Sequence, residues 1–261
     1  MQLIKTSIAA ICWAGLCSVA ASAPLTYVLN TNTTIDLTNV ATNGSVPYGT
    51  TTFASNSLAL GPTGTLYSAN SPGMLWDVTG PPIPVGPTGK TQIGDLDYAN
   101  NGLWGYSNGS SELFFFDLGS LSVTYSQAIN LPANAVVTGV AHQASSGDVF
   151  LSANNGLNND FLLRVPSFAT SATLVGPMSH GDAFSFISDI DFDASGTLYA
   201  MTWFNRYFYS VSTLTGSTSL ISTGPHRDTT AMALNPVPEP ASLAALGASL
   251  LFMARKRRRT R

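Results

Sequence analysis

Apolar and polar residues alternate over short runs along the middle of the chain, and turns rich in Gly, Asn, Ser and Pro separate these runs. Residues 198–203 place Leu, Ala and Thr on one face of an extended segment and Tyr, Met and Trp on the other. Residues 207–211 are mostly aromatic or β-branched, as strands prefer. No stretch of this body has a sustained helical apolar period. The pattern therefore predicts short β-strands and no long helix outside the two terminal segments.

The runs recur as one unit, which consists of a short apolar strand, a turn, a Leu or Val followed by an aromatic residue, and a second strand. These Leu/Val–aromatic pairs begin at Leu66, Leu103, Val149 and Leu198, which lie 37, 46 and 49 residues apart. Repeats of this length are typical of β-propeller blades with four strands each.

A fifth copy of the unit is divided between the two ends of the body. Residues 231–236 match its first strand, and residues 24–37 match its continuation. Pairing these segments would close a ring and remove exposed sheet edges. We therefore predict an all-β fold for residues 24–236, a β-propeller of about five blades closed by its N- and C-terminal strands. A β-sandwich or jelly roll is the alternative. Through units such as residues 191–200, the body resembles NHL- and YVTN-type β-propellers.

The N-terminal segment has the three parts of a secretory signal peptide. Lys5 supplies a positive region, residues 8–16 form an apolar run, and Ala21 and Ala23 frame a small-residue cleavage site. We assign residues 1–23 to this signal peptide and expect the mature chain to be exported.

The C-terminal segment also has three parts. Pro238, Glu239 and Pro240 precede 14 uncharged, mostly apolar residues at 241–254. A basic tail follows, composed of Arg255, Lys256, Arg257, Arg258, Arg259 and Arg261. A short apolar run followed by cations predicts a transmembrane helix, because long basic side chains extend the effective span of a short helix. The positive-inside rule places the basic tail on the cytoplasmic side.

This three-part order at residues 237–261 resembles the PEP-CTERM sorting signal of Gram-negative bacteria. The resemblance implies transit through the inner membrane, recognition by an exosortase-type membrane protease and cleavage near Pro238, Glu239 and Pro240. It also implies release to the cell surface or the extracellular matrix, in bacteria that form biofilms and secrete exopolysaccharide. A plain C-terminal membrane anchor is the alternative.

Composition excludes several classes of function. The net charge of −3 hides an uneven distribution, because seven of the 11 basic residues lie in the terminal segments. Residues 24–240 hold four basic residues against all 14 acidic ones, a net charge of −10, so we expect no binding to nucleic acid phosphates. Cys12 and Cys17 both lie in the signal peptide, so the mature chain has no disulfide, no Cys-ligated zinc and no Cys nucleophile.

Four aspartates are the candidate chemical groups of the body. Asp95 and Asp97 occupy the same positions of the repeat as Asp189 and Asp191. In a propeller these four carboxylates could line the central channel from two blades. Carboxylate oxygens are suitable Ca²⁺ ligands, but the segment does not match an EF-hand loop, and we predict no cofactor.

Two segments resemble catalytic motifs in residue pattern but lack the features that those motifs require. Residues 105–109 satisfy G-x-S-x-G, but a strand pattern follows where a hydrolase has a helix. Residues 84–91 approach a phosphate-binding loop, but Pro84 replaces the first required glycine. We interpret the first as a hairpin turn and the second as a connector between blades.

Histidines and aromatic residues complete the set of candidates. The three histidines lack the spacing of metal ligands: His142, His180 and His226. Six aromatic residues are candidates for sugar-stacking platforms or for the core: Trp76, Trp104, Trp203, Tyr106, Tyr207 and Tyr209.

The sequence assigns no catalytic residue. It favours a non-catalytic interaction module of the cell surface or matrix, linked to exopolysaccharide. The alternative is a secreted propeller hydrolase or lyase that acts through Asp97 and Asp191. These hypotheses differ in one observation, because an enzyme would gather its titratable residues at one mouth of the channel.

Overall fold

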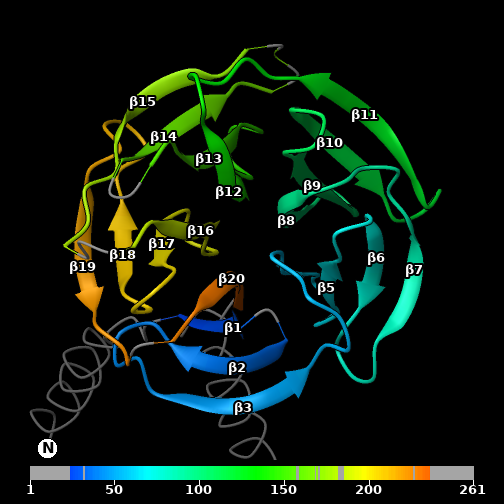
Figure 1. Cartoon of the computed structure of the whole chain (residues 1–261), viewed down its shortest axis with the longest axis horizontal. Coiled ribbons are helices and arrows are strands. Elements are labelled where there is room, and N and C mark those ends of the chain that lie inside the picture. The colour runs from blue at the N-terminus through cyan, green and yellow to red at the C-terminus, as the bar shows by residue number, and fades with distance from the viewer. Residues whose placement is uncertain are drawn as a thin grey trace, which may run out of the picture. The chain divides into compact units, whose positions relative to one another are not determined.

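The computed structural model describes residues 24–31, 33–156, 159–167, 169, 171–181, 185–225 and 227–235. Within them, strands β1 to β20 form five antiparallel sheets of four strands. Figure 1 shows the sheets arranged as blades around a central axis.

Each blade begins with an innermost strand beside the central axis, and three further strands follow in order toward the rim. Blade 1 consists of β20 (Thr229–Asn235), β1 (Leu25–Asn30), β2 (Thr34–Asn39) and β3 (Ser45–Thr50). Blade 2 consists of β4 (Ala59–Leu60), β5 (Leu66–Ala69), β6 (Met74–Asp77) and β7 (Ile83–Pro87). Blade 3 consists of β8 (Ile93–Ala99), β9 (Gly102–Ser107), β10 (Glu112–Asp117) and β11 (Ser122–Ala128). Blade 4 consists of β12 (Val136–His142), β13 (Val149–Asn154), β14 (Asp160–Val165) and β15 (Thr173–Pro177). Blade 5 consists of β16 (Ile187–Phe192), β17 (Leu198–Thr202), β18 (Phe208–Val211) and β19 (Thr218–Ser222).

The hydrophobic core lies between neighbouring blades. One cluster packs Trp104 of blade 3 against Leu151 of blade 4, and another packs Val28 of blade 1 against Phe208 of blade 5. Strand β9 is buried at every residue, whereas the outermost strand β11 is exposed at every second residue. Strand β9 therefore buries both of its faces, whereas β11 alternates between exposed and half-buried residues.

The ring closes through a strand contributed by each end of the body. Strand β20 pairs antiparallel with β1, so that Leu25 lies opposite Asn235 and Leu29 lies opposite Ala231. The five-bladed propeller closed by terminal strands is therefore confirmed, and the sandwich alternative is wrong. The repeated Leu/Val–aromatic pair begins the second strand in each of blades 2, 4 and 5 and lies one residue into it in blade 3.

A buried arginine supports the contact between blades 5 and 1. The Arg206 side chain is 1% exposed, and its Nε donates to Oδ1 of Asn43 at 2.7 Å. The amide of Asn43 donates in return to the carbonyl oxygen of Arg206 at 2.7 Å. Both residues have φ in the left-handed region, which Asn adopts more readily than most side chains. Burial lowers the pKa of Arg206, and Asp36 opposes that effect.

In the parts of the chain that the structure describes, no helix is long and apolar enough to cross a bilayer. The predicted signal peptide with Ala21 and Ala23 lies outside these parts, as do the predicted helix at 241–254 and the basic tail. The Pro238–Glu239–Pro240 motif also lies outside them.

Candidate functional site

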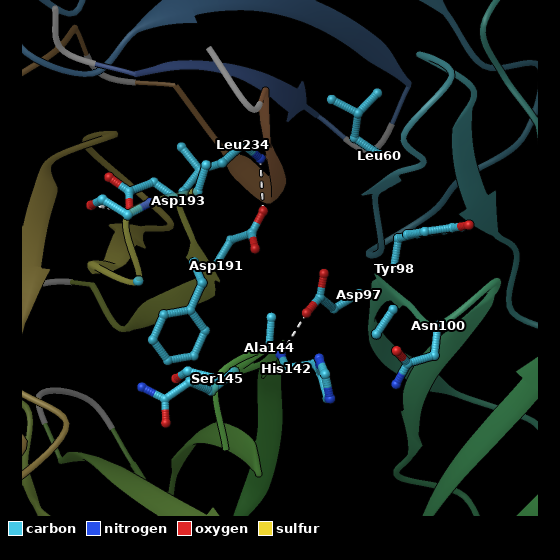
Figure 2. Close-up of a pocket in the computed structure, with 16 residues that line it drawn as sticks. Leu60, Asp97, Tyr98, Asn100, His142, Ala144, Ser145, Asp191, Asp193 and Leu234 are labelled. Atoms are coloured by element: carbon cyan, nitrogen blue, oxygen red, sulfur yellow. Dashed lines mark hydrogen bonds between the residues drawn. The ribbon is translucent and has the colours of Figure 1, made fainter. Parts of the chain in front are cut away.

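A pocket lies at each end of the central channel. The first, of about 480 Å³, is lined by residues at the C-terminal ends of the innermost strands, including Asp97, His142 and Asp191. We call it the acidic pocket, and Figure 2 shows its side chains. The second, of about 540 Å³, is lined by residues at the opposite ends of these strands, including Val136 and Phe186. We call it the neutral pocket.

The four candidate aspartates all lie on innermost strands, with Asp95 and Asp97 on β8 and Asp189 and Asp191 on β16. Residues two positions apart on a strand share a face, so each D-x-D pair points in one direction. The structure brings the four together: Asp95 and Asp189 each alter the pKa of the other, and the charge of Asp97 acts on Asp191. Figure 2 shows the carboxyl groups of Asp97 and Asp191 facing one another across the channel.

Each of these carboxyl groups also binds the next blade. Oδ2 of Asp95 accepts a hydrogen bond from the Val140 N–H at 2.9 Å, and Oδ2 of Asp97 accepts one from the His142 N–H at 2.5 Å. An innermost strand is the edge of its sheet, so its N–H groups on that side have no partner within the sheet. The D-x-D pair of blade 3 therefore fastens blade 3 to blade 4.

The second D-x-D pair makes the same contacts between blade 5 and blade 1. Oδ2 of Asp189 accepts from the Met232 N–H at 2.5 Å, and Oδ2 of Asp191 accepts from the Leu234 N–H at 2.7 Å. Because both acceptors hold β20, these two aspartates fasten the strand that closes the ring.

The channel carboxyl groups retain protons at unusually high pH. Asp95 is 1% exposed and Asp189 is fully buried, and this burial raises the pKa of each well above its ordinary value. Burial also raises the pKa of Asp191, and the charge of Asp97 raises it further. For Asp97, burial raises the pKa to about 7, although the N–H groups of His142 and Tyr98 oppose it.

Asp95 and Asp189 interact electrostatically in the channel. Oδ1 of Asp95 is buried, and no N–H or hydroxyl group of the described chain donates to it. The interaction with Asp189 lowers the pKa of Asp95, whereas the interaction with Asp95 raises the pKa of Asp189. Two carboxyl groups in contact cannot both ionise at neutral pH without a large energetic penalty. The two carboxyl groups therefore titrate as a pair and not independently.

Other polar groups of the acidic pocket have structural partners. The His142 ring stacks on Trp104 with centroids 6.4 Å apart, and burial lowers the pKa of His142. Oδ1 of Asp193 accepts hydrogen bonds from the N–H groups of Ser195 and Thr197 and so caps a turn. Within the described ranges, no three His, Cys, Asp or Glu side chains are arranged to hold a metal ion.

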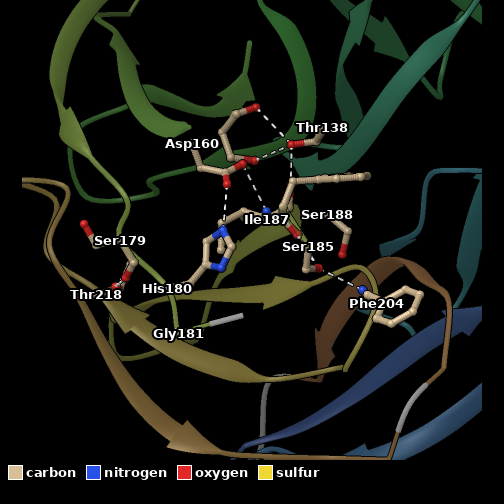
Figure 3. Close-up of polar contacts among 12 residues, drawn as sticks. Thr138, Asp160, Ser179, His180, Gly181, Ser185, Ile187, Ser188, Phe204 and Thr218 are labelled. Carbon is tan, nitrogen blue, oxygen red and sulfur yellow. Dashed lines mark hydrogen bonds and ion pairs between the residues drawn. The ribbon is translucent and has the colours of Figure 1, made fainter. Parts of the chain in front are cut away.

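A buried His–Asp pair lies between blades 4 and 5, as Figure 3 shows. Nε2 of His180 lies 2.8 Å from Oδ2 of Asp160, and both side chains are almost fully buried. Oδ1 of Asp160 accepts from the Ile187 N–H at 3.0 Å, while Thr138 Oγ1 donates to the Ile187 carbonyl at 2.7 Å. Burial raises the pKa of Asp160, and the hydrogen bond with His180 opposes this rise. No sequence pattern indicates this pair, because its members are 20 residues apart and lie in different elements. His226 lies outside the described residues.

The candidate sugar-stacking residues occupy different environments. Tyr106, Tyr209 and Trp104 are buried core residues, exposed by 0%, 3% and 7%. Trp76 and Tyr207 are half-buried and pack against hydrophobic clusters. Trp203 lines the neutral pocket.

The G-x-S-x-G segment at 105–109 and the segment at 84–91 are ordinary parts of blades. Ser107 ends β9, its hydroxyl donates to the Thr91 carbonyl oxygen at 2.7 Å, and strand β10 follows the turn. Strand β7 includes Pro84 and Pro87, so the interpretation of residues 84–91 as a connector is wrong for their first part. An outermost strand tolerates proline because one of its edges makes no ladder hydrogen bonds.

Comparison with known proteins identifies the C-terminal segment. Residues 236–259 match the PEP-CTERM protein-sorting motif. The motif indicates an exported protein that is anchored through its C terminus before an exosortase processes it. No curated protein matches the chain.

Two solved structures illustrate the likeness of the body. A chain of a nidogen/laminin complex is 8% identical with a TM-score of 0.55, and the match covers 80% of this chain and 97% of that one. The extracellular domain of a one-component system from B. thetaiotaomicron is 14% identical with a TM-score of 0.46, covering 80% of this chain and 29% of that one. At these identities the likeness concerns the fold alone.

Proposed function

We propose that the mature chain is a non-catalytic binding module of the cell surface or extracellular matrix, where its partner is exopolysaccharide. The signal peptide directs export, the C-terminal helix holds the chain transiently in the inner membrane, and an exosortase-type protease then releases residues 24–236. The observation that carries the proposal is a sorting motif that begins immediately after the strand that closes the ring.

The body suits binding better than chemistry. Every channel aspartate uses one oxygen to hold the next blade, so these residues have a structural role that needs no substrate. The closed ring offers a rigid support with a pocket at each end of its channel. The acidic body would repel anionic polymers, which favours an uncharged polysaccharide as the partner.

Replacing Pro238, Glu239 and Pro240 with alanine tests the sorting step. We expect this variant to stay in the membrane fraction with its basic tail, because the protease loses its recognition motif. Fractionation of the native host and the intact mass of the chain would measure it. The control replaces Pro81 and Pro82, in the loop before β7, and should be released like the wild type. Release of the motif variant at the wild-type mass would contradict the proposal.

A second function has one observation in its favour, namely that Asp97 and Asp191 face one another in the acidic pocket. One protonated and one ionised carboxyl group can act as general acid and base on a glycosidic bond. If the protein is such a hydrolase or lyase, Asp97→Asn should abolish the release of new chain ends from host exopolysaccharide. The amide still accepts from the His142 N–H, so the fold should survive. No turnover by the wild type between about pH 5 and about pH 8 would eliminate this function.

A further inference from the structure

The neutral pocket contains an aromatic platform built from two rings. Phe186 precedes β16, and Trp203 follows β17. Their ring centroids are 5.3 Å apart with an interplanar angle of 12°, so the rings are stacked. Both side chains are half-buried and line the pocket, which leaves part of the stack open to solvent.

Hydrogen bonds hold this platform in place before any ligand arrives. The Trp203 N–H donates to the Phe186 carbonyl at 3.0 Å, and the Trp203 carbonyl accepts from the Thr229 N–H at 2.8 Å. The Phe204 N–H donates to Oγ of Ser185 at 2.9 Å, as Figure 3 shows. A binding surface fixed in this way loses little conformational entropy when a ligand binds.

Polar side chains border the platform. Asn56, Ser71 and Gln92 line the pocket and are exposed. Gln92 has a φ of 49°, in the left-handed region that side chains other than Gly and Asn seldom adopt. Hydrogen bonds from its N–H to the Ser71 carbonyl and from the Asn108 N–H to its own carbonyl keep this conformation. Amides and hydroxyls are both donors and acceptors, as recognition of sugar hydroxyls requires.

The neutral pocket and the acidic pocket differ in the charge of their lining residues. None of the described residues that line the neutral pocket has an ionisable side chain. The acidic pocket, in contrast, contains Asp97, Asp191 and Asp193. The described lining of the neutral pocket therefore offers a ligand apolar contact and neutral hydrogen bonds.

We infer that the neutral pocket binds an uncharged pyranose residue of a polysaccharide, with the apolar face of the sugar stacked on Trp203. The inference rests on the proposed function and identifies its binding site. Trp203 supplies a rigid apolar surface, and Asn56 and Gln92 bind hydroxyl groups at the edge of the ring. The position at the channel mouth lets the rest of the polymer extend across the face of the propeller.

Titration of residues 24–236 with uncharged hexasaccharides of glucose, mannose and xylose tests the inference. The indole N–H resonance of Trp203, assigned by its loss in Trp203→Phe, should shift with at least one of them at a Kd of about 1 mM or below. Trp203→Leu should weaken binding about tenfold or more, because it fills space without an aromatic face, whereas Trp203→Phe should lose much less. Trp76→Leu in blade 2 is the matched control and should bind like the wild type.

Variants on the surface keep the test valid if Trp203→Leu does not fold. Asn56→Ala and Gln92→Ala change exposed side chains, and each should weaken binding severalfold without changing the unfolding midpoint. No shift of the Trp203 resonance with any uncharged hexasaccharide would overturn the inference. Tighter binding of an acidic hexagalacturonate or of a peptide at Trp203 would also overturn it.

Co-sedimentation with host exopolysaccharide separates this inference from the proposed function. If the wild type and Trp203→Leu sediment equally, the matrix function stands and the Trp203 site is wrong. If Trp203 binds hexasaccharides but the chain is never released from the membrane, the site stands and the proposed sorting is wrong.

Discussion

A chain that ends at Asp228 is expected not to fold, although it lacks only the last strand of the body, Thr229–Asn235. Blade 1 would lose its innermost strand, and β1 would expose a full edge along the channel. The core would also lose Ala231, Met232 and Ala233, all at most 1% exposed. Burial of such side chains and their ladder hydrogen bonds amounts to several kcal/mol, comparable with the whole stability of a domain. Circular dichroism and urea unfolding would measure the loss.

A circular permutant provides the matched control for that truncation. Leu25 lies opposite Asn235 in the antiparallel pair, so a short turn can join the end of β20 to the start of β1. Moving residues 229–235 in front of Leu25, with an Asn-Gly turn in place of Pro236 and Pro24, therefore restores blade 1 as a continuous sheet. We expect this permutant to unfold cooperatively at nearly the wild-type urea concentration. A truncated chain as stable as the permutant would show that β20 contributes little to the fold.

Stability is expected to fall as the pH rises from about 4 to about 7, the reverse of what paired carboxylates usually produce. The folded chain keeps protons on its channel aspartates that the unfolded chain releases near pH 4, so each increase in pH in this window favours unfolding. For Asp97 the window ends near its folded pKa of about 7. The raised pKa values of Asp95, Asp189 and Asp191 act in the same direction.

Asp97→Asn should remove part of this pH dependence. The amide oxygen can still accept from the His142 N–H, and no charge has to be buried. We expect this variant to exceed the wild type by roughly 1 kcal/mol or more in unfolding free energy near pH 8, and to match it near pH 4. Asp97→Leu should be less stable than the wild type at both pH values, since it leaves that N–H unpaired.

Asp77→Asn, in blade 2, serves as the control for removal of one carboxylate outside the channel. Urea unfolding at a series of pH values would measure all three variants. An Asp97→Asn profile that runs parallel to the wild type would show that Asp97 does not hold a proton in the folded chain.

The repeat made much of the fold predictable from the sequence. The Leu/Val–aromatic pair recurs because each second strand needs large apolar side chains on both faces, as in the fully buried β9. The divided fifth copy likewise predicted the closing pair of β1 and β20. The D-x-D positions follow the two-residue period of a strand, which places Asp95 and Asp97 on one face as soon as β8 is recognised.

The contacts between blades could not be predicted in this way. Asn43 and Arg206 are 163 residues apart, and their pairing depends on how blade 5 packs against blade 1. Asp160 and His180 meet only after blade 4 has formed. The segment containing Pro84 resembles a loop because proline signals a turn in sequence, whereas an outermost strand accepts it. Such contacts depend on geometry in three dimensions and leave no local pattern.

The position of β20 makes closure of the ring depend on the last strand of the body to be translated. Strands β1 to β3 leave the ribosome first, yet the innermost strand of their blade is the last part of the body to be synthesised. Until it arrives, the edge of β1 is unprotected, so a prematurely terminated chain presents an open ring to chaperones and proteases. The sorting motif begins at residue 236, directly after β20, so the strand that closes the ring is translated before the segment that directs processing.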